Sequence, residues 1–362
     1  MSGLRDRIAR LIEAAGPLSV ADYMTLCLFD TEAGYYTTRQ PFGVEGDFTT
    51  APEISQMFGE LVGVWVYSAW NALGRPLPVT IAEIGPGRGS LMKDLLRTLT
   101  RLDADLAGQA SFALVEISPK LAAVQKTTLA GCDVDISWHP TIDTLPSVPL
   151  IVVANELFDA IPVRQFVLSD GRWRERCVGL DEAGDLCFAT GAALLDPSLL
   201  PADAADAAPG VIFEASNGRS ALMDAIAARV AANGGGGLFF DYGHLEPGLG
   251  DTLQAVRKHR YEGVLENPGE ADLTSHVDFA ALAAVARRNG LDAHLMTQGD
   301  FLVRSGLLER AGRLGADADP AFREKIAADV ERLAGPDAMG TLFKVLAILP
   351  PNTAIPPFGP AR

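Results

Sequence analysis

A chain of 362 residues with 48% hydrophobic content is long enough to bury a large core, as one elaborated domain or two. Its formal net charge of −16 argues against nonspecific nucleic-acid binding, which requires a basic surface. No apolar run in it reaches the ~18 residues that a membrane span requires. The charge does permit a basic protein or peptide as a partner.

The amino-terminal residues and the cysteines both bear on the compartment. The segment MSGLRDRIARLIEAAG lacks the apolar centre of a signal peptide, and its acidic residues argue against a transit peptide. The cysteines form no C-x-x-C pair, so we interpret them as core or incidental thiols in a reducing compartment and expect no metal site. The sequence therefore predicts a cytoplasmic protein. It leaves the oligomeric state open, a homodimer included.

The first sixty residues are expected to form a helical lid region. One amphipathic helix is predicted over residues 4–14, and a second runs from its cap Ser19 to about Phe29. The apolar face of the first helix would hold Leu4, Ile8, Leu11 and Ile12.

A loop and a long helix follow, the helix running from about Ser55 to Leu73, with Pro52 ending the coil before it. Polar residues gather at the start of this helix, and they are either its caps or a lid over a ligand: Asp47, Thr49, Thr50 and Glu53.

The stretch PVTIAEIGPGRGSLMKDLLR, residues 78–97, organises the rest of the chain. It predicts a buried strand ending at Ile84, a glycine turn, and a helix with leucines at helical spacing. The turn reads G-P-G-R-G, not the G-x-G-x-x-G of dinucleotide folds, because Ser90 occupies the last position. The glycines that would let a ligand lie against the backbone are Gly85, Gly87 and Gly89. Glu83, just before the turn, suits the amino group of a methionine-like ligand, which favours S-adenosylmethionine.

The next two strands supply further candidate cofactor contacts. Residues 111–118 predict a strand that ends at Glu116, whose two oxygens could accept both ribose hydroxyls, and Pro119 begins a helix to about Ala130. The third strand covers residues 134–139. Two of its residues could meet the adenine edge, although an exposed aspartate is also common at a strand start: Asp135 and Ile136.

The fourth strand, Leu150 to Ala154, ends in the polar residues Asn155, Glu156 and, further on, Asp159. Strand carboxyl ends are where α/β folds keep catalytic residues. Alternatively, Asn155 caps a following helix with Glu156 in its first turn. The two interpretations can coexist.

The remainder continues the sheet and adds insertions. We expect the first part of the core over residues 61–165, a β-meander insertion over 166–210, the rest of the core over 211–349 with an insertion at about 245–275, and a tail over 350–362. The basic run RKHR within the second insertion is too short to bind nucleic acid, and indicates a solvated face or a partner contact.

The segments GDFTTAPEISQMFGELVG, EIGPGRGSLMKDLLR, NELFDAIPVRQF, DYGH and PGEADLTSHVDF resemble the MidA family over roughly residues 19–349. This resemblance implies a class I methyltransferase, an α/β fold with a seven-stranded, mostly parallel Rossmann-like sheet in the order 3-2-1-4-5-7-6, and S-adenosyl-L-methionine as donor. The family's cofactor motif maps onto Glu83, Gly85, Gly87, Gly89 and Glu116, and its NELFDA-type segment onto Asn155, Glu156 and Asp159. RKHR departs from the RGF-type sequences of relatives.

Eukaryotic members of this family are mitochondrial arginine methyltransferases needed to assemble respiratory complex I. The resemblance therefore implies a protein substrate, with the quinone-side subunit of complex I as the leading candidate. For an arginine acceptor, the expected catalytic residues are Glu156 and Asp159, taken to lie one helical turn apart, and His244, which could accept a proton or be structural. An assembly factor that binds the cofactor without turnover is the alternative.

Overall fold

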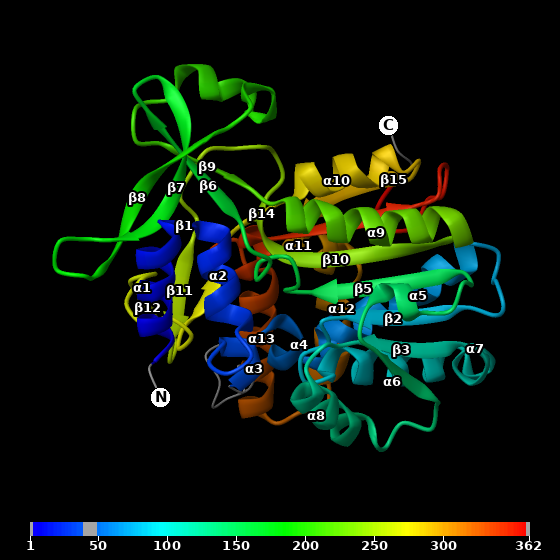
Figure 1. Ribbon diagram of the computed structural model, residues 1–362. Helices are drawn as coiled ribbons and strands as arrows, with labels where there is room; N and C mark the ends of the chain where they lie inside the picture. Colours follow the sequence, from blue (N-terminus) through cyan, green and yellow to red (C-terminus); the bar gives the residue numbers. More distant parts are fainter. Residues whose placement is uncertain (1–2, 39–48, 360–362) are drawn as a thin grey trace. The chain divides into compact units, whose positions relative to one another are not determined.

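The computed structural model describes residues 3–38 and 49–359, and the chain divides into two compact units (Figure 1). The accessory unit consists of Met1–Phe48, Phe158–Ala221 and Glu246–Val277. The sheet unit consists of Thr49–Leu157, Leu222–Leu245 and Asp278–Arg362. The accessory unit takes in most of both expected insertions, and also residues 158–165 and 211–221, which were expected in the core. Residues 49–60, expected in the lid region, belong to the sheet unit.

The strands of the sheet unit have the order β15-β16-β10-β5-β2-β3-β4. Numbered along the chain, this order read from β4 is 3-2-1-4-5-7-6, so the predicted class I methyltransferase sheet is confirmed. Strands β2, β3, β4, β5 and β10 are parallel, and β16 runs antiparallel to both of its neighbours. The strands are β2 (Thr80–Ile84), β3 (Ser111–Val115), β4 (Ile136–His139), β5 (Leu150–Asn155), β10 (Gly235–His244), β15 (Asp292–Thr297) and β16 (Phe343–Leu349).

Both faces of this sheet are buried, which explains why its central strands are almost uniformly apolar. Side chains alternate between the faces: Ile151 and Val153 of β5 join one hydrophobic cluster, and Val152 between them does not. That cluster also takes in residues of α5 (Gln56–Ala72) and α6 (Ser90–Leu102).

The helices of this unit are α4 (Ala51–Ile54), α5 (Gln56–Ala72), α6 (Ser90–Leu102), α7 (Ala104–Gln109), α8 (Pro119–Leu129), most of α9 (Asn217–Asn233), α10 (Phe279–Arg288), α11 (Gln298–Arg304), α12 (Leu307–Gly315), α13 (Pro320–Ala334) and α14 (Met339–Leu342).

Local sequence explains where several helices begin. The side chains of Ser55 and Ser118 accept hydrogen bonds from backbone N–H groups at the starts of α5 and α8, and Pro119 takes the first position of α8. Pro52 was expected to end a coil, and this is wrong, because it lies near the start of the short helix α4. A proline is tolerated there because the N–H it lacks has no partner in a first helical turn.

The accessory unit combines the amino-terminal helices with antiparallel strands. Its helices are α1 (Leu4–Ala15), α2 (Val20–Phe29) and α3 (Tyr35–Thr38), with the short 3-10 helices η2 (Pro197–Leu199) and η3 (Ala202–Asp206); η1 (Ile142–Thr144) lies in the sheet unit. One sheet contains β1 (Leu18–Ser19), β6 (Arg164–Ser169), β7 (Arg172–Leu180), β8 (Leu186–Leu194) and β9 (Ile212–Ala215), and another contains β11 (Gln254–Arg257), β12 (Arg260–Glu262) and β13 (Asp272–Thr274). The chain leaves this unit for the sheet unit within β14 (Val277–Asp278).

Several predictions for the accessory unit are confirmed by these elements. Both amino-terminal helices are present, and Ser19 caps α2 through the N–H of Asp22 at 3.0 Å. In α1, Leu11 is 44% exposed, so it does not share the buried face of Leu4, Ile8 and Ile12. RKHR forms the β11–β12 hairpin turn.

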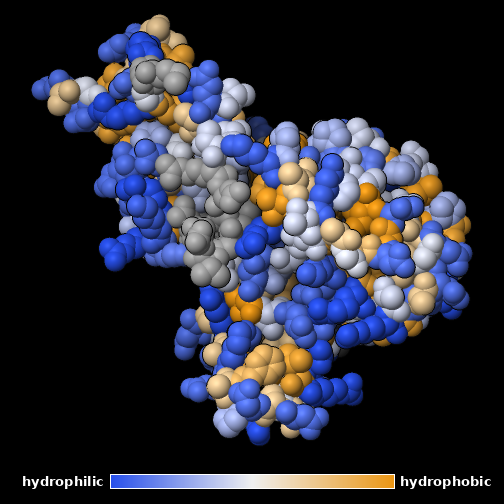
Figure 2. Space-filling view, turned by 90° about the horizontal axis from the view of Figure 1, so that it is seen from below, coloured by the Kyte–Doolittle hydropathy of each residue, from blue (hydrophilic) through white to orange (hydrophobic). Residues whose placement is uncertain are grey.

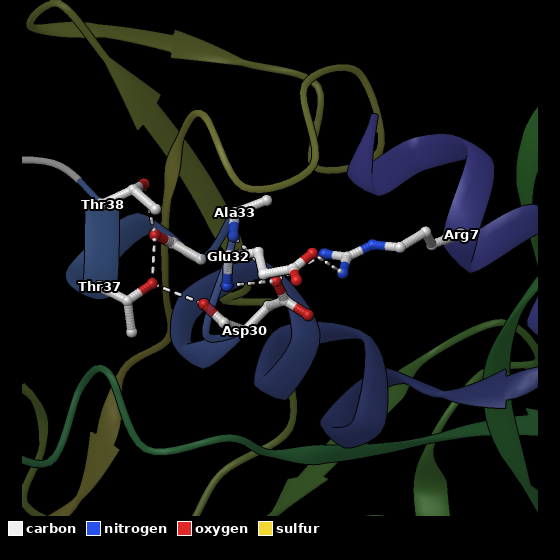
Figure 3. Close-up of polar contacts among 7 residues, drawn as sticks. Arg7, Asp30, Glu32, Ala33, Thr37 and Thr38 are labelled. Carbon is white, nitrogen blue, oxygen red and sulfur yellow. Dashed lines mark hydrogen bonds and ion pairs between the residues drawn. The ribbon is translucent and has the colours of Figure 1, made fainter. Parts of the chain in front are cut away.

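A polar cluster centred on Asp30 closes the end of α2 (Figure 3). One oxygen of its carboxylate, Oδ1, accepts hydrogen bonds from Arg7 and from the backbone N–H groups of Glu32 and Ala33. The backbone carbonyl of Asp30 accepts a hydrogen bond from Thr37. This Asp30 cluster is therefore made of donors and acceptors that satisfy one another.

The surface in Figure 2 shows hydrophobic residues in separate patches among hydrophilic ones. Among residues 3–38 and 49–359, no helix has both the length and the apolar character that crossing a bilayer would require.

Candidate cofactor and active site

The glycine turn lies at the carboxyl end of β2 and leads into α6. Gly85, Gly87 and Gly89 all have left-handed backbones, with φ of 64°, 50° and 84°. A side chain in this region is strained, which is why glycine occupies all three positions. The turn is braced internally by a hydrogen bond of 2.7 Å from the N–H of Gly89 to the carbonyl of Pro86.

Glu83 stands one residue before the end of β2 and is only 3% exposed. Burial raises its pKa well above the ordinary value, although a hydrogen bond from the backbone of Met92 acts in the opposite direction. Its Oε2 atom is buried and has no hydrogen-bond partner among the described residues. A buried acceptor without a donor is costly, so this oxygen is suited to receive a donor from a ligand.

Glu116 follows β3 directly, and its carboxylate is held at both oxygens. Oε1 accepts the N–H of Ser118 at 2.7 Å, and Oε2 accepts the side-chain amide of Gln125 at 2.9 Å. Burial raises the pKa of Glu116, and the same hydrogen bonds counter that rise. Each carboxylate oxygen can accept more than one hydrogen bond, so the group retains capacity for a diol.

Ile117, next to Glu116, was not selected from the sequence, yet it is 71% exposed. An apolar side chain so exposed, directly after Glu116, offers a surface for a flat ring. Its position directly after the strand-terminal acid was the available signal.

Glu53 of α4 approaches the glycine turn from another segment. Its carboxylate accepts a hydrogen bond from the hydroxyl of Ser90, the first residue of α6, and lies 3.7 Å from Arg88 of the turn. Glu53 is thus tied to the glycine turn. Thr50, the residue before α4, makes no side-chain hydrogen bond that would cap this helix. Thr49 is half-buried, and Asp47 lies outside the described residues.

The expected adenine contacts are not brought to this edge. In the parallel register of β3 and β4, Ile136 is opposite Phe112 and His139 is opposite Val115. Asp135 and Ile136 thus lie at the amino end of β4, whereas the glycine turn and Glu116 follow the carboxyl ends of β2 and β3. Three residues of strand span about 10 Å, which places this pair at the far edge of the sheet.

The end of β5 departs from the helical interpretation. Residues 156–163 contain no helix, so Asn155 does not cap one and Glu156 and Asp159 are not one helical turn apart. Glu156 instead has a left-handed backbone with φ of 52°, which is uncommon for a residue other than glycine. Such strained residues cluster at functional sites. The turn is held by the carboxylate of Asp241 in β10, whose Oδ2 accepts the N–H of Leu157 at 3.1 Å.

Asn155, the last residue of β5, is 8% exposed, and its amide donates to Oε1 of Glu156 at 2.9 Å. Its own Oδ1 is buried without a hydrogen-bond partner among the described residues. His244 is the half-buried last residue of β10, a neighbour of β5. Asn155 is opposite Phe240 in the parallel register of these two strands, so His244 lies four residues, about 13 Å of strand, beyond the end of β5, on the same carboxyl side of the sheet as Asn155 and Glu156.

Asp159 belongs to the accessory unit, whereas Glu156 belongs to the sheet unit. Asp159 is 6% exposed, and its backbone carbonyl accepts hydrogen bonds from Arg219 and from the N–H of Ser275. Glu156 and Asp159, although three residues apart in the sequence, therefore do not lie on one helix.

The sheet-unit edge fits S-adenosylmethionine by the chemistry of its groups. The cofactor offers an ammonium donor, a ribose diol and a flat adenine ring. The edge offers buried acceptors at Glu83 and Asn155, a carboxylate at Glu116 and an exposed apolar side chain at Ile117. Asp135 and Ile136, at the opposite edge of the sheet, take no part in that fit.

Comparison with known proteins gives concordant results. Residues 61–297 match a family described as "Putative S-adenosyl-L-methionine-dependent methyltransferase". A protein of Burkholderia thailandensis, whose crystal structure holds S-adenosyl-homocysteine, is 29% identical with a TM-score of 0.82, covering 96% of this chain and 91% of that one.

Curated relatives are similar over most of their length. The protein arginine methyltransferase NDUFAF7 of Danio rerio is 36% identical, covering 96% of this chain and 86% of the relative. Its human counterpart is 34% identical, covering 94% of this chain and 81% of the relative. Both are named mitochondrial, which contradicts the cytoplasmic location predicted above. That prediction is wrong because it relied on the lack of a leader pattern, which does not itself specify a compartment.

Proposed function

The chain belongs to the family of S-adenosyl-L-methionine-dependent methyltransferases, and from this premise we propose that it methylates an arginine side chain of a partner protein. The resemblance to the MidA family, the class I fold and the cofactor expected from the sequence are confirmed by the comparisons. The arginine acceptor is supported by the names of the relatives, which are protein arginine methyltransferases.

The cofactor site that we propose comprises the glycine turn and the acids on either side of it. The protein backbone at Gly85, Gly87 and Gly89 would lie against the cofactor. Glu83 and Asn155 would accept hydrogen bonds from the ammonium group of the cofactor. Glu116 would accept the two ribose hydroxyls, and Ile117 would pack on adenine. When bound, S-adenosylmethionine supplies a methyl group that its positive sulfur makes electrophilic.

The chemical problem is that arginine is a poor nucleophile. Its guanidinium keeps its proton in water, because its pKa exceeds ~12, and its lone pair is delocalised. We propose that Glu156 binds guanidinium nitrogens through charge-assisted hydrogen bonds, which would concentrate electron density on the nitrogen that attacks. Methyl transfer to that nitrogen would break the carbon–sulfur bond of the cofactor and release one proton, for which His244 is the proposed acceptor.

The strained backbone of Glu156 is the observation that most supports this assignment. A left-handed residue other than glycine costs free energy, and neither a helix cap nor a tight hairpin requires it here. The hydrogen bond from Asn155 and the turn held by Asp241 fix the Glu156 carboxylate next to the end of β5. This proposed site does not include Asp159, which belongs to the accessory unit.

For the partner, we propose the quinone-side subunit of respiratory complex I. The support is the resemblance to the MidA family, whose eukaryotic members serve complex I assembly. Mass spectrometry of complex I subunits from a deletion strain and its parent tests this. An arginine that is methylated in the parent and unmethylated in the deletion strain is the expected result.

The catalytic role of Glu156 is tested by two substitutions. Glu156→Gln keeps the shape and removes the charge, so methyl transfer should fall by ~10² or more while cofactor affinity is retained. Glu156→Gly relieves the left-handed strain, so thermal stability should hold or rise while transfer is lost.

Asp300→Asn, which changes an exposed carboxylate in α11, is the matched control and should leave transfer unchanged. Near-normal transfer by Glu156→Gln would remove Glu156 from the mechanism. If the parent itself produced no S-adenosylhomocysteine with its partner, the assembly factor without turnover would replace the enzyme.

A further inference from the structure

Gln125 of α8 connects two parts of the proposed cofactor site that are distant in sequence. Its side chain is 0% exposed. Its amide nitrogen donates to the carbonyl of Gly87 at 2.8 Å and to Oε2 of Glu116 at 2.9 Å. Its amide oxygen accepts the indole N–H of Trp138 at 3.0 Å. One buried amide thus contacts the glycine turn, the strand-terminal acid and β4.

We propose that Gln125 is a positioning residue that orients the Glu116 carboxylate and the Gly87 turn together, and thereby determines the preference for a ligand with a ribose diol. The inference rests on the role proposed above for Glu116. It assigns a function to a residue whose place in the middle of a predicted helix gave no indication of the site.

The physical basis is preorganisation. A free glutamate side chain loses rotamer freedom when a ligand orders it, and that loss weakens binding. Here Ser118 and Gln125 hold one carboxylate oxygen each before any ligand arrives, so the remaining lone pairs have a set direction. The same amide also holds the carbonyl of Gly87, so the position of the glycine turn and the orientation of the Glu116 carboxylate depend on one another.

Only an amide can fill this position. Its nitrogen meets two acceptors, the Gly87 carbonyl and the Glu116 carboxylate, and its oxygen meets a donor. The indole N–H of Trp138 can only donate, so it requires the amide oxygen on its side and directs the nitrogen to the two acceptors. A glutamate would place oxygen against oxygen, and a methionine would retain the volume and lose all three hydrogen bonds.

The test measures binding of S-adenosylhomocysteine and of its 2′-deoxy counterpart by calorimetry, so that it does not depend on turnover. Gln125→Met should weaken S-adenosylhomocysteine about tenfold and should weaken the 2′-deoxy counterpart less, since that ligand lacks one of the two hydroxyls that Glu116 receives. The parent's preference for the diol should therefore shrink.

Gln298→Met is the matched control, because Gln298 is also 0% exposed in the sheet unit and donates to a backbone carbonyl, that of Leu333, at 2.9 Å. This control should lower thermal stability without changing the affinity or the preference for the diol. A purely structural role for Gln125 would give the same pattern as the control, and would overturn the proposal.

A double-substitution cycle with Glu116→Ala separates this inference from the proposed cofactor site. If Gln125 acts through Glu116, Gln125→Met should cost much less affinity in the Glu116→Ala background than in the parent. Fully additive losses would overturn the positioning role alone. If Glu116→Ala itself bound like the parent, the cofactor site would be wrong.

Should Gln125→Met fail to fold, Trp138→Phe leaves Gln125 in place and removes only the N–H that orients its amide. It should weaken S-adenosylhomocysteine about threefold and reduce the diol preference. Unchanged affinity and preference in Trp138→Phe would then overturn the proposal.

Discussion

Glu83 of the sheet unit and Asp30 of the accessory unit are both acids at the end of a regular element, and their surroundings differ in an informative way. Asp30 accepts hydrogen bonds from Arg7 and two backbone N–H groups, and these lower its pKa although burial alone would raise it (Figure 3). Glu83 is buried with an oxygen that has no partner among the described residues, and its pKa is raised. A carboxylate whose oxygens are hydrogen-bonded within the protein supports the fold, whereas one with a buried oxygen lacking a donor is available to a ligand.

The backbone of the two units supports the same distinction. Asp170 and Gly171 in the accessory unit have φ of 51° and 70°, and the two-residue β6–β7 hairpin requires such values. Glu156 in the sheet unit has φ of 52° with no hairpin to require it. A left-handed residue is therefore a functional signal only where the local turn does not already explain it.

Gly87→Val carries the largest expected effect in this comparison. The left-handed backbone of Gly87 does not tolerate a β-branched side chain, and the new atoms would also meet the cofactor. The substitution should therefore abolish binding of S-adenosylmethionine, which titration calorimetry measures.

Gly171→Val introduces the same strain in the accessory unit, where an added Cβ meets no atom within 4 Å. It should lower stability and leave cofactor binding intact. Loss of binding in both variants would show that global destabilisation, and not the turn, explains the result.

Glu116→Ala should weaken cofactor binding by about 1–3 kcal/mol, because two charge-assisted hydrogen bonds to the ribose are lost. Glu116→Gln should cost less, since one acceptor oxygen remains. Titration calorimetry with S-adenosylhomocysteine measures both, and parental affinity in the two variants would remove Glu116 from the site.

Glu83→Gln should weaken cofactor binding by about 1 kcal/mol. It should also abolish the release of a proton that we expect when the cofactor binds to the parent protein. The raised pKa keeps Glu83 protonated in the free protein at pH values where an exposed carboxyl is ionised. A cofactor ammonium would favour the charged form, so binding should expel a proton, and affinity should increase as pH rises toward the folded-state pKa.

Calorimetry at one pH in two buffers that differ in ionisation enthalpy counts the released protons. The same proton count for the parent and Glu83→Gln would contradict this assignment.

Asp30→Asn carries the smallest expected effect, a loss of about 1 kcal/mol of unfolding free energy with no change in cofactor affinity. The pKa of Asp30 is lower in the folded state than in the unfolded chain. Its stabilisation is therefore present above pH ~4 and is lost as pH falls through the folded-state pKa.

Thermal unfolding of the parent and Asp30→Asn should consequently converge in acid. Asp185→Asn, which removes an exposed ion pair with Arg5, is the control and should change stability by less than about 0.5 kcal/mol. A gap between the parent and Asp30→Asn that is unchanged down to pH 3 would indicate that the charge of Asp30 does not matter.

Local sequence determined the parts of this protein that depend on near neighbours. Apolar runs and caps located the central strands, the helix from Pro119, and α2 with its cap Ser19. The spacing of Gly85, Gly87 and Gly89 indicated a ligand turn, because left-handed geometry is a property of single residues. Motif resemblance supplied the strand order, which local patterns do not encode.

Only the tertiary structure decided which of the candidate residues meet. Asp135 and Ile136 matched a plausible position along the chain, and the register of β4 against β3 puts them at the other edge of the sheet. Glu156 and Asp159 are close in sequence and belong to different units, because the chain leaves β5 through a strained turn and not through a helix. Gln125 reaches Gly87, Glu116 and Trp138 only after three separate βα segments pack together. Hydrogen bonds between distant segments depend on packing, and no local pattern of residues specifies them.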